Sequence, residues 1–165
     1  MTIGQCFFIP AVTFAVQVFC EQALAAPSPL YRMSQLEEAK KAAQAQNKPI
    51  AWIATFAKNL APYDQRLTNK GSHAATAYAI RALQNDTILV TSDSGTENHQ
   101  EPPIVDQELH TPDPHYKAPV VVILTSKLDR VITKILYIEN GQERIQAYTE
   151  ALKKIRDPSS WGDKK

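Results

Sequence analysis

Residues Ile50-Ala51-Trp52-Ile53-Ala54-Thr55-Phe56 form an apolar run with the length of one β-strand. Asn47-Lys48-Pro49 precedes this run and ends any helix that approaches from the N-terminal side. The run does not alternate between apolar and polar residues, as a strand with one solvent-facing side would. The sequence therefore predicts a buried strand in the middle of a sheet.

Helices and further strands surround this central strand in the sequence. Ser34-Gln35-Leu36-Glu37 has the spacing of a capping box, and with a Glu37/Lys41 pair it predicts a helix over residues 34–46. The pattern after the central strand predicts a helix from Ser72 to about Leu83, a buried strand over 87–91, one helical turn at 104–109, a buried strand over 120–124, a hairpin turn at 127–130, its antiparallel partner over 131–138 and a helix over 142–157.

The last helix and the C-terminal end complete the predicted domain. Helical spacing places Ile145, Tyr148, Leu152 and Ile155 on the inward face of that helix. Residues 157–165 are polar and are predicted to form a frayed tail. The fold class that follows is α/β, with a central mixed sheet flanked by helices.

Length, composition and charge exclude several kinds of protein. The 165 residues are 44% hydrophobic and 21% charged, which is ordinary for one globular domain. Eighteen Lys and Arg residues face 17 Asp and Glu residues, for a net charge of +1. A near-neutral chain gives no electrostatic reason to expect nucleic acid or an anionic membrane as a partner.

Residues 1–25 resemble a signal peptide. Ile3–Cys20 is almost continuously apolar, and Ala23-Leu24-Ala25 supplies small residues for cleavage before Ala26. No Lys or Arg precedes Arg32, so an uncleaved membrane anchor remains the alternative, and a membrane is expected as a partner only in that case. Cys6 and Cys20 both lie in this segment, so cleavage would leave no thiol. We expect a secreted or periplasmic protein.

The long connection over residues 94–118 is rich in acidic residues and histidines. His110, Asp113 and His115 are ligand types found in zinc and copper(II) sites, but their spacing matches no defined metal motif. A metal site needs three or four converging ligands. We therefore expect a solvated surface loop without a metal or cofactor, and we keep metal binding through these residues as the alternative.

The element order and two local motifs resemble the thioredoxin-like fold over residues 31–156. After the central strand, Phe56-Ala57-Lys58-Asn59-Leu60-Ala61-Pro62-Tyr63 is similar to the turn that carries the family's Cys-Gly-Pro-Cys motif. Ala118-Pro119, leading into Val120–Leu124, is similar to the family's cis-proline strand. The resemblance implies a cis peptide bond at Pro119, against the roughly 5–6% base rate for such bonds.

The same resemblance implies a loss of redox chemistry. Leu60 and Tyr63 occupy the positions of the family's two cysteines, Pro62 keeps the motif proline, and Ala54 replaces a buried acid. Thiol–disulfide exchange needs an attacking thiolate and a second thiol, which leucine and tyrosine cannot supply. The sequence also contains no Gly-x-Ser-x-Gly turn, the motif that would indicate a serine hydrolase.

Without redox chemistry, the resemblance implies that the domain acts by binding. We expect a non-enzymatic module that binds a peptide or protein partner through Leu60, Pro62, Tyr63, Ala118 and Pro119. Besides the metal-binding alternative, an inert structural domain remains possible on the sequence alone.

Overall fold

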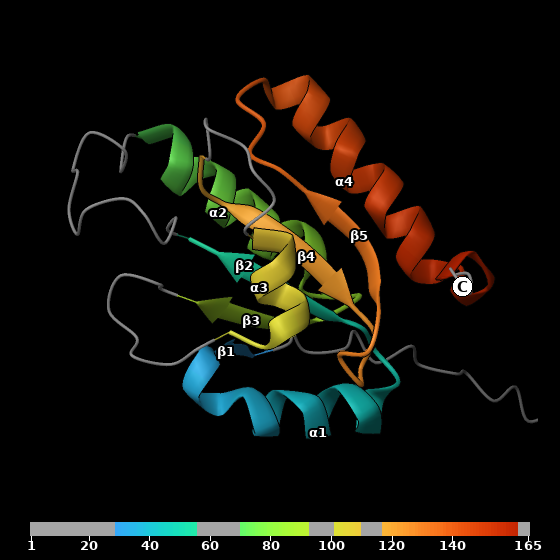
Figure 1. The fold of residues 1–165 in the computed structure, drawn as a ribbon. Helices are drawn as coiled ribbons and strands as arrows, with labels where there is room; N and C mark the ends of the chain where they lie inside the picture. Colours follow the sequence, from blue (N-terminus) through green and yellow to red (C-terminus); the bar gives the residue numbers. More distant parts are fainter. Residues whose placement is uncertain (1–28, 56–69, 93–100, 110–116, 162–165) are drawn as a thin grey trace, which may run out of the picture.

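The computed structural model describes residues 29–55, 70–92, 101–109 and 117–161. Figure 1 shows a sheet with helices on both sides. The elements, in chain order, are β1 (Leu30–Arg32), the 3₁₀ turn η1 (Met33–Gln35), α1 (Leu36–Gln46), β2 (Ile50–Ala54), α2 (Lys70–Leu83), β3 (Ile88–Ser92), α3 (Pro103–Leu109), β4 (Val120–Leu124), β5 (Val131–Ile135), α4 (Gly141–Arg156) and the 3₁₀ turn η2 (Pro158–Trp161).

The five strands form one mixed sheet in the order β1-β3-β2-β4-β5. β1, β3 and β2 run parallel, whereas β4 pairs antiparallel with both β2 and β5. Every residue of β2 and β4 is buried. The predicted central position of the 50–56 segment and the predicted α/β class with a mixed sheet are therefore confirmed.

The sheet separates two hydrophobic cores. Ile50 and Trp52 of β2 face α1 and α3, whereas Ala51 and Ile53 face α2 and α4. In Figure 1, α3 crosses in front of the sheet and α2 lies behind it. A strand covered on both faces has no solvent side, which explains why its sequence is continuously apolar.

The N-terminal cap of α1 differs from the sequence prediction. The chain enters through the 3₁₀ turn η1, and the Gln35 side chain accepts a hydrogen bond from the Arg32 backbone N–H at 3.1 Å. The capping box predicted at Ser34 is wrong, because the residue that caps the turn is Arg32, two positions earlier. Within α1, Glu37 pairs with Lys40 at 2.9 Å rather than with Lys41.

Other boundaries shift by a few residues. α2 begins at Lys70 rather than Ser72, and β3 covers 88–92 rather than 87–91. The strand predicted over 131–138 ends at Ile135, beyond which β4 offers no paired residue.

The inward face of α4 was predicted correctly in three of four positions. Tyr148 and Ile155 are buried and Leu152 packs against the same core, but Ile145 is 47% exposed. The half-buried Arg144 lies one turn before Tyr148, and its guanidinium reaches backbone carbonyls at the end of the sheet. Arg144 therefore occupies the position that the spacing had given to Ile145.

Residues 158–161 of the predicted frayed tail form the ordered turn η2. η2 folds back on α4, and the Trp161 indole donates to the Lys154 carbonyl at 2.7 Å. Arg130, in the β4–β5 hairpin, donates to the Trp161 carbonyl at 2.6 Å. These hydrogen bonds tie residues 158–161 to the rest of the fold.

Candidate functional site

The candidate site lies where β2 and β3 end and β4 begins. Ala54 pairs with Ser92 on one side and with Val120 on the other, so these three strand ends lie side by side at one end of the sheet. We call this end of the sheet, at the carboxyl ends of β2 and β3, the edge around Pro119. In Figure 1 this edge is on the left, where the arrowheads of β2 and β3 point. The carboxyl edge of parallel strands is where α/β sheets commonly bind ligands.

The peptide bond between Ala118 and Pro119 is cis, as the sequence predicted. Pro119 is buried, Ala118 is half-buried and Lys117 is exposed. Proline donates no backbone hydrogen bond, which suits a position just before the first paired residue of a strand. The backbone therefore rises from the buried start of β4 to the surface within three residues.

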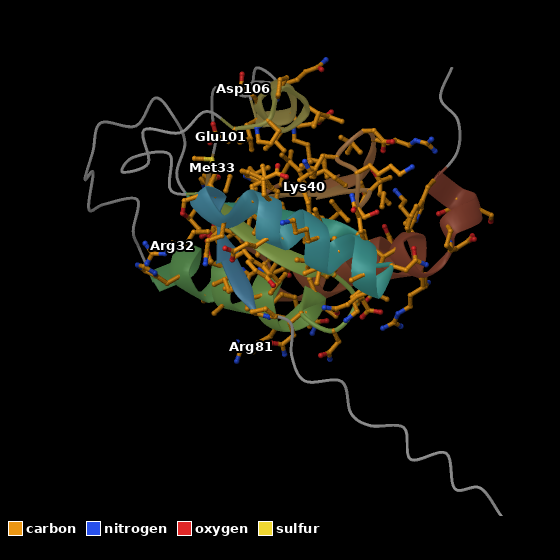
Figure 2. The ribbon with its side chains drawn as sticks, turned by 90° about the horizontal axis from the view of Figure 1, so that it is seen from below. Arg32, Met33, Lys40, Arg81, Glu101 and Asp106 are labelled. Carbon is orange, nitrogen blue, oxygen red and sulfur yellow. The ribbon has the colours of Figure 1, made fainter. Side chains whose placement is uncertain are left out.

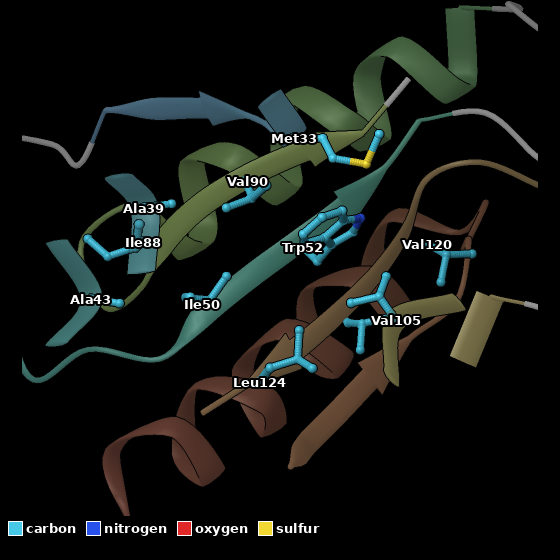
Figure 3. Close-up of a cluster of buried hydrophobic side chains, with 11 residues drawn as sticks. Met33, Ala39, Ala43, Ile50, Trp52, Ile88, Val90, Val105, Val120 and Leu124 are labelled. Carbon is cyan, nitrogen blue, oxygen red and sulfur yellow. The ribbon is translucent and has the colours of Figure 1, made fainter. Parts of the chain in front are cut away.

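A set of hydrogen bonds fixes the ends of β2 and β3 at this edge. The Trp52 indole N–H donates to Ser92 Oγ at 2.9 Å, with both side chains buried. The Ser92 carbonyl accepts from the Thr55 N–H at 3.2 Å and from Thr55 Oγ1 at 3.1 Å. Figure 3 shows the Trp52 ring at the centre of the core beneath the site. These bonds join the ends of β2 and β3 at this edge.

The sequence prediction placed Trp52 in the core but missed its bond to Ser92. A buried indole N–H usually has a hydrogen-bond partner, so the predicted burial of Trp52 already implied an acceptor nearby. Ser92 follows the strand predicted over 87–91 directly and was assigned to no predicted element.

Part of the connection over 94–118 is packed rather than solvated. Residues 103–109 form α3, and Val105 is completely buried. Glu101 is only 5% exposed, and Figure 2 shows it at the base of α3. The helical turn predicted at 104–109 is confirmed as α3. The prediction of a solvated loop is wrong for residues 101–109, because the apolar side of α3 packs into the core shared with α1.

Beside the cis-proline, Lys117 contacts the segment that follows β5. Its ammonium lies 5.6 Å from the centre of the Tyr137 ring and 3.8 Å from Glu139 Oε2. Arg144 donates to the Ile138 carbonyl and to the Glu139 carbonyl, both at 2.9 Å. This corner, defined by Lys117, Tyr137 and Glu139, was not identified from the sequence.

Several residues predicted to form a site lie outside the described residues. They are Leu60, Pro62 and Tyr63 of the proposed turn, His110, Asp113 and His115 of the metal alternative, and the whole of the segment 1–25. The structure therefore places only Ala118 and Pro119 of the predicted binding residues. Within the described ranges, no three His, Cys, Asp or Glu side chains gather in a way that could hold a metal ion.

Two further findings concern the chain as a whole. Among the helices that the structure describes, none has both the length and the apolarity to cross a membrane. Comparison of the chain with protein-family models, with curated proteins and with solved structures found no match.

Proposed function

We propose that this protein is a thioredoxin-like domain that has lost disulfide chemistry and binds an extended peptide segment at the edge around Pro119. The observation that carries the proposal is the meeting of the ends of β2 and β3 with the start of β4, where Ala118 and Pro119 lead from the surface into the sheet. The element order and the mixed sheet with helices on both faces support it.

Extended peptide is the ligand that suits a strand end of this kind. Proteins recognise extended peptides by combining hydrogen bonds to the peptide backbone with pockets for alternate side chains. The Trp52, Ser92 and Thr55 hydrogen bonds join the ends of β2 and β3, so this part of the site is ordered before a ligand binds. In the proposal, Leu60, Pro62 and Tyr63 supply the side-chain contacts from the turn after β2.

Peptide binding is tested by fluorescence anisotropy with a pool of labelled, extended octapeptides. The Ala118→Tyr variant places a ring over the proposed edge, and Lys127→Tyr places the same ring in the exposed hairpin at the far end of β4. We expect Ala118→Tyr to weaken binding at least about tenfold, the loss of roughly 1.4 kcal/mol, and Lys127→Tyr to leave it unchanged. Equal effects of both variants would contradict the proposed location.

The loss of redox chemistry is a separate prediction. Leu60 and Tyr63 have no thiol, so we expect insulin reduction with dithiothreitol to proceed no faster than in buffer. The Cys6→Ser/Cys20→Ser double variant is the control, because it removes the two cysteines of the chain. Turnover above buffer by the full chain that is lost in the double variant would overturn the non-redox proposal.

Export remains part of the proposal. We infer that residues 1–25 direct the chain out of the cytoplasm and are removed, which makes the working protein secreted or periplasmic. The apolar run and the small residues before Ala26 support this. N-terminal sequencing of the protein recovered outside the cytoplasm tests it, with Ala26 as the expected first residue.

A further inference from the structure

We propose that Lys117 makes the peptide-binding edge selective for a ligand carboxylate placed next to the segment that lies along Ala118–Pro119. This inference rests on the proposed peptide binding and adds the chemistry of the preferred ligand. It is carried by the corner that Lys117, Tyr137 and Glu139 form beside the cis-proline.

The sheet register positions Lys117 at this corner. Val121 pairs with Ile135, and continuing that antiparallel register beyond the strands brings Lys117 level with Glu139. The Lys117 ammonium lies over the Tyr137 ring at 5.6 Å, close enough for a cation–π attraction. Arg144 donates hydrogen bonds to the backbone carbonyls of residues 138 and 139, which fixes the segment that carries Glu139.

The ion pair that Lys117 makes within the protein is easily exchanged. Its ammonium and the Glu139 carboxylate are 3.8 Å apart, and their side chains are 57% and 81% exposed. Exposed pairs of this kind contribute little to stability, because water screens both charges. An incoming carboxylate can therefore replace Glu139 as the partner of Lys117 at small cost, while Tyr137 keeps the ammonium in place.

A neighbouring carboxylate on the ligand is the chemistry that fits. Lys117 is one residue before Ala118, so a peptide lying along Ala118–Pro119 brings its own side chains near the ammonium. A neutral side chain there gains no charge interaction, and a basic one is repelled by Lys117. The carboxylate could belong to an Asp or Glu side chain or to the C-terminus of the ligand.

The test measures anisotropy with three octapeptide pools that share one random core and carry Glu, Gln or Lys at the flanking positions. We expect the Glu pool to bind about three- to fivefold more tightly than the Gln pool, the range typical of exposed charge pairs. The Lys pool should bind more weakly than the Gln pool. Pools with free or amidated C-termini show whether a side chain or the terminal carboxylate is the source.

Variants assign the preference to Lys117. Lys117→Gln should abolish the difference between the Glu and Gln pools, and Lys117→Glu should reverse the order so that the Lys pool binds best. Lys127→Gln removes an exposed lysine at the far hairpin and should keep the wild-type order. Tyr137→Leu should reduce the preference without reversing it, because the ammonium loses its position over the ring.

Each possible failure has a distinct meaning. If no pool binds the wild-type protein, the proposed peptide binding itself fails. If all three pools bind with equal affinity, peptide binding stands and the selectivity is overturned. If Lys117→Gln weakens the binding of all pools by the same factor, Lys117 contributes to peptide affinity but not to selectivity for ligand charge. That result also overturns the inference.

Discussion

Replacing Trp52 by alanine is expected to destabilise the protein by about 3–5 kcal/mol, the range for deleting a buried aromatic side chain. The Trp52 ring is completely buried at the centre of the core that faces α1 and α3. The substitution removes its packing and also its hydrogen bond to Ser92, which leaves a buried hydroxyl without its donor. Urea unfolding followed by circular dichroism measures the loss.

Two variants separate packing from hydrogen bonding at this position. Trp52→Phe keeps a large ring, and we expect it to cost about 1–3 kcal/mol, mostly from the Ser92 hydroxyl. Trp161→Ala removes the other tryptophan of the chain, which sits half-buried in η2, and should cost about 1 kcal/mol or less. A loss below about 1 kcal/mol for Trp52→Ala would contradict the central position of this ring.

A loss of about 3–5 kcal/mol is also expected for Tyr148→Ala. Tyr148 is 4% exposed on the inner face of α4, and its ring meets Tyr78 of α2 edge to face, with centroids 5.3 Å apart. This contact joins the two helices that cover one face of the sheet. Tyr148→Phe keeps the ring pair and should cost far less, so a comparable loss in both variants would contradict this account.

The phenol of Tyr148 adds a dependence on alkaline pH. Burial raises the pKa of Tyr148 above its ordinary value of 10.0, with the charge of Arg144 opposing the shift and Tyr78 adding to it. In the unfolded chain the phenol ionises near pH 10, whereas the folded state keeps it neutral. The contribution of Tyr148 to the free energy of unfolding is therefore complete below about pH 10. It falls as pH rises further, by at most about 1.4 kcal/mol per pH unit.

Tyr148→Phe isolates this effect, because phenylalanine cannot ionise. Between pH 10 and 11.5 the variant should lose less stability than the wild-type protein in urea unfolding. Tyr137→Phe serves as the control, since Tyr137 is partly exposed near the end of β5. Identical alkaline profiles for wild type and Tyr148→Phe would contradict the inferred burial of the phenol.

Most of the fold could be predicted because its strands are nearly pure apolar runs. Ile50–Ala54 and Val120–Leu124 have no solvent face, and prolines and polar turns mark where they begin. The ends of elements were predicted less well. Gln35 replaced Ser34 in the cap before α1, since the chain arrives through a 3₁₀ turn that periodicity does not reveal.

The candidate site was predictable only where a motif marks it. The resemblance of Ala118-Pro119 to a cis-proline strand implied the cis bond, which the structure confirms. The contacts of Trp52 with Ser92 and of Lys117 with Tyr137 join residues 40 and 20 positions apart in the chain. Such pairs depend on strand order and register, which a single sequence does not disclose.

The most direct test of the central proposal is to locate the bound peptide by nuclear magnetic resonance. The ¹⁵N-labelled protein is titrated with the octapeptide pool, and amide shifts are followed residue by residue. We predict the largest changes at Lys117, Ala118 and Val120 and at Thr55, with little change in the hairpin over residues 126–130. Shifts confined to that hairpin, or no shifts at saturating peptide, would contradict peptide binding at the cis-proline edge.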